Sequence, residues 1–232
     1  MKLEKVVIVS PIEISQIKRN LTKHNFQIVE KNPDFVLCYG GDGTILFSER
    51  KFPQVPKLVI KKSIICRKID YNLLDLENKL ERIREKKFMI RKEIKLETEN
   101  KKLIGLNEIQ VRAKLPTNAL RFSTFVNGKE FRNLIGDGVI IATPFGSTGY
   151  YKSTGGKKFK KGIGISFNNL HNRKIKSFVA SEDSVIKVGI NRGPAWIIAD
   201  NNERFFELED NNVYTIRKSA SVANFIYFPN SV

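Results

Sequence analysis

The sequence has few of the residues from which disulfides and metal sites are built. Among its 232 residues are two cysteines and two histidines, and Cys38 and Cys66 match no metal-ligand spacing. Cys38 ends an apolar run, residues 35–38. We therefore expect buried, reduced thiols in a reducing compartment. At this length we also expect a core that is stable without cross-links.

Long hydrophobic runs are missing as well. No segment approaches the roughly 18 consecutive apolar residues of a membrane span. The first five residues lead into only four apolar ones, which is too short a run for a signal peptide. The sequence therefore predicts a soluble, cytoplasmic protein that uses no membrane.

Acidic residues are scarce relative to basic ones, 24 against 41, which gives a formal net charge of +17. Clustered Lys and Arg bind nucleic acid through counterion release. Here, however, the basic residues are scattered, and the sequence shows no arginine-rich arm, zinc finger or aromatic-basic RNA-binding pattern. Nucleic acid is therefore not the expected main partner, and a small polyanionic substrate would benefit from the same positive field.

The first 88 residues alternate between strand and helix patterns, which predicts parallel βαβ units with ligands at the carboxyl ends of the strands. The predicted strands are residues 6–10, 26–30, 34–39 and 57–65, and the predicted helices are residues 12–24, 44–50 and 71–87.

Residues 89–212 have a different pattern of short, alternating apolar and polar runs separated by turn residues. Asn127-Gly128 between two such runs predicts a β-hairpin. We expect this second region to be a β-rich domain. The predicted strands include residues 121–126, 185–190, 196–199, 204–208 and 213–216.

A glycine-rich block, Gly40-Gly41-Asp42-Gly43-Thr44, follows the predicted strand 34–39. Glycines bring the backbone close to a ligand and leave amide groups free for phosphate oxygens. Asp42 is suited to accept the proton of an attacking hydroxyl while Thr44 and the amides hold phosphates. The alternative is a simple tight turn, for which Gly-Asp-Gly is a common sequence.

Asn107-Glu108 forms a second polar pair at the end of an apolar run. A carboxylate beside an amide suits the two neighbouring hydroxyls of a ribose, although taken alone the pair is more typical of a solvent-facing strand end.

A third block, residues 136–150, concentrates bare backbone, hydroxyls and an aromatic ring in one loop. Such a loop can hold a nucleotide, with Tyr150 available for stacking. Ser153 lies three residues further on, so it can share a helical face with Tyr150.

In this order the three blocks resemble the three signature blocks of the NAD kinase family, and the likeness extends to Gly155-Gly156 and to Asp200. The resemblance implies an α/β Rossmann-like N-terminal domain, residues 1–88, and a β-rich, β-sandwich-like domain, residues 89–212. It also implies that the C-terminal segment, about residues 213–232, returns to complete the first domain.

The resemblance implies an enzyme that transfers the γ-phosphoryl group of ATP, or of polyphosphate in some members, to the adenosine 2′-hydroxyl of NAD. A divalent cation, Mg²⁺ or another, would be the cofactor, and the protein would be a homo-oligomer, a dimer or tetramer, whose neighbouring subunits help to complete the site. Asp42 matches the catalytic base, and Glu108 matches a residue on the ribose. The implied binding residues are Gly41, Asp42, Gly43, Thr44, Asn107, Glu108, Asp137, Thr148, Gly149, Tyr150 and Ser153.

The sequence departs from the family pattern at residues 61–67, where a glycine-rich segment is replaced by Lys61-Lys62-Ser63-Ile64-Ile65-Cys66-Arg67. This departure keeps open the alternative of a catalytically silent dinucleotide-binding relative. A second alternative, from the shared Gly-Gly-Asp-Gly motif, is a lipid or sugar-phosphate kinase of the wider superfamily, although Asn107-Glu108 and the block at residues 136–150 argue against it.

Overall fold

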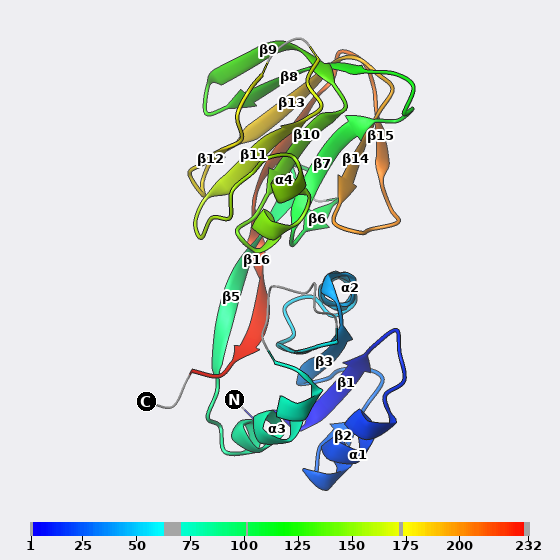
Figure 1. Ribbon diagram of the computed structural model, residues 1–232, viewed down its shortest axis with the longest axis vertical. Coiled ribbons are helices and arrows are strands. Elements are labelled where there is room, and N and C mark those ends of the chain that lie inside the picture. Colours follow the sequence, from blue (N-terminus) through cyan, green and yellow to red (C-terminus); the bar gives the residue numbers. More distant parts are fainter. Residues whose placement is uncertain (1, 63–70, 101, 172–173, 230–232) are drawn as a thin grey trace. The chain divides into compact units, whose positions relative to one another are not determined.

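The computed structural model describes residues 2–62, 71–100, 102–171 and 174–229. The chain forms two compact units (Figure 1). Unit 1 is Met1–Glu93 with Val222–Val232, and unit 2 is Ile94–Ser221. Two strands, β5 (Met89–Thr98) and β16 (Val213–Tyr227), each begin in one unit and end in the other.

Unit 1 is an α/β unit whose strands pair in parallel in the order β2-β1-β3-β4-β16. The alternation of strands and helices predicted from the sequence is confirmed. Its strands before β16 are β1 (Lys5–Val9), β2 (Gln27–Ile28), β3 (Phe35–Gly40) and β4 (Lys57–Lys61), and its helices are α1 (Ser15–Lys23), α2 (Asp42–Lys51), the 3₁₀-helix η1 (Leu73–Asp75) and α3 (Leu76–Arg84).

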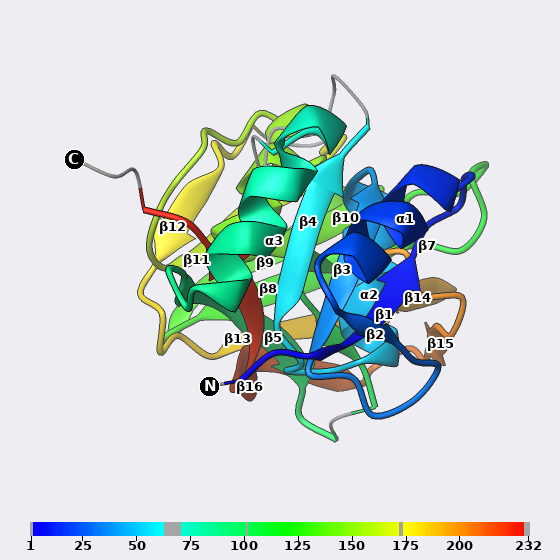
Figure 2. The ribbon, with the colours of Figure 1, turned by 90° about the horizontal axis from the view of Figure 1, so that it is seen from below.

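Helices α1 and α3 lie on the same face of this sheet (Figure 2). They bury apolar residues spaced three or four apart, Ile17 and Leu21 from α1 and Leu80 and Ile83 from α3, against strand residues such as Leu37. Neighbouring strand residues point to opposite faces, so Cys38 points away from this cluster, and its thiol lies beside Ser48 of α2.

Helix α2 begins two residues earlier than predicted, at Asp42 rather than Thr44. Gly41 is its N-cap, with an extended backbone. A carboxylate in the first turn of a helix is stabilised by the positive end of the helix dipole, so Asp42 starts the helix instead of lying in a loop before it. Helix α1 differs in the opposite direction, because it begins at Ser15, later than the predicted start at Ile12.

A buried ion pair connects α2 to β4. Lys57 and Glu49 form it with almost no exposed side-chain surface, and the Lys57 ammonium also donates to the Phe52 carbonyl at 2.8 Å. Buried charges are tolerated only when they are paired and hydrogen-bonded. The predicted strand from residue 57 to 65 ends here at Lys61, and residues 63–65 lie outside the described part of the chain.

Unit 2 contains two antiparallel sheets. The first has the order β12-β11-β10-β7-β14-β15, and the second has the order β16-β13-β8-β9, with β5 pairing both β16 and β6. The strands of the first are β7 (Glu108–Ala113), β10 (Gly138–Ala142), β11 (Ile163–Asn168), β12 (Phe178–Ala180), β14 (Ala195–Ala199) and β15 (Phe206–Leu208); the second adds β6 (Ile104–Gly105), β8 (Leu120–Val126), β9 (Lys129–Gly136) and β13 (Ile186–Arg192).

Apolar residues from both sheets form one core, to which Val111 and Ile165 contribute from the first sheet and Phe122 and Val188 from the second. This is the packing of a β-sandwich, and the predicted β-rich, sandwich-like architecture is confirmed. Asn127-Gly128 makes the predicted two-residue hairpin turn between β8 and β9, both residues having positive φ.

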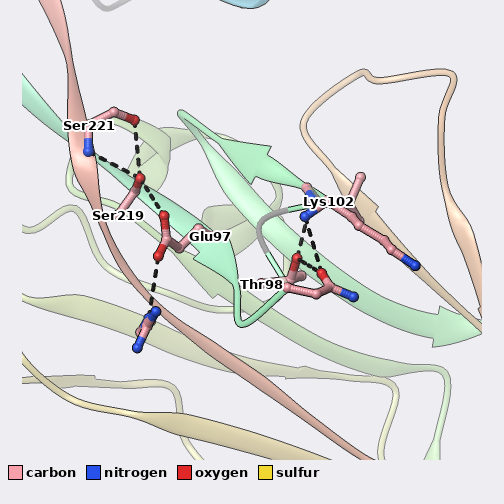
Figure 3. Close-up of polar contacts among 8 residues, drawn as sticks. Glu97, Thr98, Lys102, Ser219 and Ser221 are labelled. Atoms are coloured by element: carbon pink, nitrogen blue, oxygen red, sulfur yellow. Dashed lines mark hydrogen bonds and ion pairs between the residues drawn. The ribbon is translucent and has the colours of Figure 1, made fainter.

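The predicted strand 213–216 was too short, because β16 continues to Tyr227. Polar contacts along β5 and β16 support this length (Figure 3). Buried Glu97 accepts from the Ser219 hydroxyl at 2.8 Å and from the Arg217 guanidinium at 3.3 Å, and the Ser221 amide donates to Ser219. These hydrogen bonds neutralise the Glu97 carboxylate and satisfy polar groups of β16. A sequence pattern of alternating apolar residues does not reveal them.

Among the described residues, no helix combines the length and the apolar character that a membrane crossing requires.

Candidate active site

The residues predicted to form the site fall into two groups, one in each unit. In unit 1, Gly40 ends β3 and Asp42 starts α2, so the glycine block occupies the carboxyl end of a parallel strand, where α/β folds bind their ligands. A side chain at Gly40 would collide with the Thr44 hydroxyl, whereas a Cβ at Gly41 would meet nothing within 4 Å. The backbone at Gly41 therefore has open space beside it where α2 begins at Asp42.

Asp42 is half-buried, and its Oδ1 atom is excluded from solvent. The Thr44 amide donates to the Gly41 carbonyl at 3.0 Å, which closes the first turn. The Lys62 amide donates to the Gly40 carbonyl at 3.2 Å, so the first two residues of the atypical segment 61–67 run beside the glycine block. Residues 63–67 of that segment lie outside the described residues.

In unit 2, the loop before β7 presents Asn107 and Glu108, both of which are buried. Asp200, just after β14, holds this loop through its carboxylate. It accepts backbone N–H groups of Leu106 at 2.7 Å, Asn107 at 2.7 Å and Glu108 at 3.1 Å. Hydrogen bonds to an ionised acceptor are short and strong, so Asp200 determines where Asn107 and Glu108 lie.

Thr143, the residue directly after β10, holds the same loop. Its hydroxyl donates to the Leu106 carbonyl at 2.6 Å, and its amide donates to the Asn107 carbonyl at 2.9 Å. Its hydroxyl also accepts the Gly146 amide at 3.0 Å. Any side chain at Gly146 would collide with the Asn107 carbonyl. The second and third motif blocks are therefore packed directly on each other.

Four further predicted residues follow in the same loop. Thr148 ends the 3₁₀-helix η2 (Phe145–Thr148), Gly149 caps α4 (Tyr150–Ser153), and Tyr150 and Ser153 are the first and last residues of that short helix. A Cβ at Gly149 would lie 3.2 Å from Glu108 Oε2 and 3.6 Å from Asn107 Nδ2. The absence of a side chain at Gly149 thus leaves space beside both polar side chains. Tyr150 is 54% exposed.

Asp137 lies apart from this group. It precedes β10, whose far end, Ala142, pairs with Glu108, while Gly138 pairs with Arg112. Since strands rise about 3.3 Å per residue, about 13 Å of strand separates Gly138 from Ala142. The Asp137 carboxylate accepts instead from the Asn169 side-chain amide at 2.7 Å.

Asp200 and Thr143 are not among the predicted site residues. The sequence signal for Asp200 is its resemblance to the family, and Thr143 is one hydroxyl among several in the third block. Their importance follows from backbone contacts across 92 to 94 residues for Asp200 and 37 residues for Thr143.

No group of three or more His, Cys, Asp or Glu side chains able to hold a metal ion occurs among the described residues. In unit 1, Asp42 is the carboxylate of the glycine block. Mg²⁺ commonly uses one or two carboxylates together with substrate phosphates and water, and a single carboxylate beside a phosphate-binding backbone fits that pattern.

A glycine-rich helix start on a parallel sheet, together with a buried Asn-Glu pair under a hydroxyl-rich loop, defines a nucleotide-dependent phosphotransferase. The family model described as the ATP-NAD kinase C-terminal domain matches residues 106–228. The chain belongs to the NAD kinase family.

Comparison with individual relatives supports this family assignment. An NAD kinase of Sulfurisphaera tokodaii is 34% identical over 197 residues, covering 81% of this chain and 77% of the relative. An NAD kinase of Clostridium botulinum is 27% identical over 243 residues, covering 98% and 83%. The crystal structure of an NAD kinase from Archaeoglobus fulgidus in complex with ATP shares the fold, with a TM-score of 0.83, 24% identity, and coverage of 100% of this chain and 94% of that one.

Proposed function

We propose that this protein is an NAD kinase in which Asp42 acts as the general base. The 2′-oxygen of the adenosine ribose forms a bond to the γ-phosphorus of ATP. The bond between that phosphorus and the oxygen shared with the β-phosphate breaks, the hydroxyl proton passes to Asp42, and ADP leaves. The single observation that carries this assignment is the position of Asp42, the first residue of α2 at the carboxyl end of β3, behind the open backbone of Gly41.

The other residues have binding roles in this proposal. Gly41, Gly43 and Thr44 hold phosphate oxygens through amides and a hydroxyl at the positive end of α2. Asn107 and Glu108 bind the ribose hydroxyls, because an amide can donate while a carboxylate accepts. The hydroxyl-rich loop of Thr148 and Gly149 lines the dinucleotide site. Tyr150 offers a ring for stacking, and Ser153 lines the same site.

A divalent cation, Mg²⁺ or another, would be bound mainly by substrate phosphates and water, with Asp42 as the carboxylate nearest the phosphate-binding backbone. When bound, it would neutralise charge that develops on the transferred group. ATP is the proposed donor, and polyphosphate is the alternative donor to test.

We also propose that the protein works as a homo-oligomer in the cytoplasm. The position of Asp137, at the opposite end of β10 from Glu108, supports a role for Asp137 in a neighbouring subunit's site. The buried free thiol of Cys38 supports a reducing compartment. Light scattering of the purified protein would test the oligomer, and a strictly monomeric, active protein would contradict it.

The test of the function is NADP formation from NAD, ATP and Mg²⁺ by the wild type and by Asp42→Asn. We expect the variant to lose about 10²- to 10⁴-fold in turnover, the range that a general base contributes, while NAD binding measured by calorimetry persists.

Asp75→Asn is the matched control, because Asp75 also lies at the start of a helix, α3, and should leave turnover unchanged. Comparable turnover in Asp42→Asn would remove Asp42 from the mechanism. A folded wild type that binds NAD but forms no NADP with either ATP or polyphosphate would make the protein a silent binder.

A further inference from the structure

Basic residues are scattered along the chain, but one stretch has no acidic residues to balance them. Residues 138–181 contain eight Lys and Arg residues and no Asp or Glu, so they supply eight of the net seventeen positive charges. The stretch runs from β10 through α4 and β11 to β12. A field of one sign over so short a segment attracts anions.

A pocket of about 580 Å³ lies inside this stretch, between the segment that follows α4 and the segment that enters β12. Lys157, Lys158 and Lys176 line it, together with Tyr151, Phe159 and Ser177. No acidic residue lines the pocket in the part of the chain that the structure describes. Pockets of 300 to 1,000 Å³ are typical of small-molecule sites.

The frame of the pocket is rigidly packed. Tyr151 is buried and meets Phe159 edge to face, with ring centroids 5.3 Å apart. A side chain at Gly156 would collide with the Tyr151 ring, and a Cβ at Gly164 of β11 would lie 2.6 Å from Phe159. The Ser177 hydroxyl donates to the Gly155 carbonyl at 3.0 Å, which joins the two segments. The lysines therefore project from a backbone that needs little rearrangement to bind a ligand.

The three lysines have no acidic partner among the described residues. Like charges held around one pocket repel one another. A multiply charged anion bound between the lysines would attract each ammonium group and offset this repulsion. Ammonium groups bind phosphate as point charges through short, charge-assisted hydrogen bonds. Tyr151 and Phe159 could contact a ligand that carries a ring. The three lysines, however, require only phosphate groups.

We propose that this pocket, which none of the candidate active-site residues lines, is a second anion site that binds small molecules carrying two or more linked phosphate groups. The phosphates lie against Lys157, Lys158 and Lys176. Inorganic oligophosphates and nucleoside diphosphates share this chemistry, and the experiment distinguishes them.

The first measurement is calorimetry with inorganic tripolyphosphate and, separately, with ADP, on the full chain without divalent cation. Lys157→Gln/Lys158→Gln should weaken binding at the pocket about tenfold or more, since charged hydrogen bonds are each worth about 1.5–3 kcal/mol. Binding should also weaken as ionic strength rises.

The matched control is Lys160→Gln/Lys161→Gln. It removes the same charge from the same loop, but neither lysine lines the pocket, so it should leave most of the affinity. Equal losses in the two variants would show a diffuse charge effect and overturn the proposal. Tripolyphosphate binding without ADP binding would assign the site to inorganic oligophosphates, and the converse would assign it to nucleotides; each supports the site.

Acetylation of lysines, read by mass spectrometry, localises the binding independently of any site at Asp42. Tripolyphosphate should protect Lys157, Lys158 and Lys176 and leave Lys160 and Lys161 reactive. Absence of selective protection would overturn the proposal. Tighter, cooperative binding of single-stranded oligonucleotides to the same lysines would also overturn it, since the ligand class would then be nucleic acid.

Discussion

Cys38 lies on β3 without exposed surface, and burial raises the pKa of its thiol to about 12. The Ser48 hydroxyl and the Lys57 ammonium oppose this shift but do not overcome it. Thiolate is the reactive form of cysteine. At pH 8 only about one Cys38 thiol in ten thousand would be ionised, so position in the fold makes this thiol inert.

We predict that Cys66→Ser, which leaves Cys38 as the sole thiol, reacts with Ellman's reagent at pH 8 only on the timescale of unfolding, and at once in guanidinium. The denatured sample serves as the control, and immediate labelling of the native variant would contradict the buried position. The sign of the shift also means that the free energy of unfolding should fall as pH rises above about 8.5, because only the unfolded chain then loses the thiol proton.

At the scale of elements, the loop before β7 depends on the end of β14. One carboxylate, Asp200, accepts three consecutive backbone N–H groups there, and its own amide donates to the Glu108 carbonyl at 3.0 Å. Asp200 has φ of +51°, a conformation that Asn and Asp adopt more readily than most residues. It is therefore a positioning residue for Asn107 and Glu108.

We predict that Asp200→Asn raises the KM for NAD about tenfold or more, because charge-assisted hydrogen bonds worth about 1.5–3 kcal/mol are weakened. The KM for ATP should change much less. Asp210→Asn is the matched control, since Asp210 accepts a single backbone amide, that of Gly193, at 2.7 Å. Steady-state kinetics with NAD and ATP varied in turn would measure the two KM values. Equal changes in both would indicate a general loss of structure and contradict the positioning role.

At the scale of the whole molecule, each unit has its own hydrophobic core. One cluster contains residues of unit 1 alone, and the other contains residues of unit 2 alone. Leu37 lies in the first and Ile165 in the second, both fully buried. Stability is therefore expected to be distributed by unit, as regions with separate cores open separately.

We predict that Leu37→Ala increases amide hydrogen exchange mainly in peptides of unit 1, and that Ile165→Ala does so mainly in unit 2. Each substitution leaves a cavity worth about 2–5 kcal/mol of destabilisation. Each variant is the control for the other, measured by exchange mass spectrometry under native conditions. A uniform increase throughout the chain in both variants would show that the two cores open together.

The sequence by itself determined the strand–helix alternation of residues 1–88, the buried faces of α1 and α3, the Asn127-Gly128 hairpin and the order of the three motifs. These are local signals, carried by periodicity and turn chemistry over a few neighbouring residues. The same local reasoning misplaced the start of α2 and the end of β16, because capping and cross-strand pairing decide where elements begin and end.

Only the tertiary structure decided which polar groups meet. Asp200 reaches a loop 92 to 94 residues earlier, Lys57 is buried against Glu49, and Lys176 joins Lys157 and Lys158 around one pocket. A carboxylate or lysine at each of these positions looks like any solvated charge in the sequence. Its partner is distant along the chain, so its role follows from packing and burial rather than from local pattern.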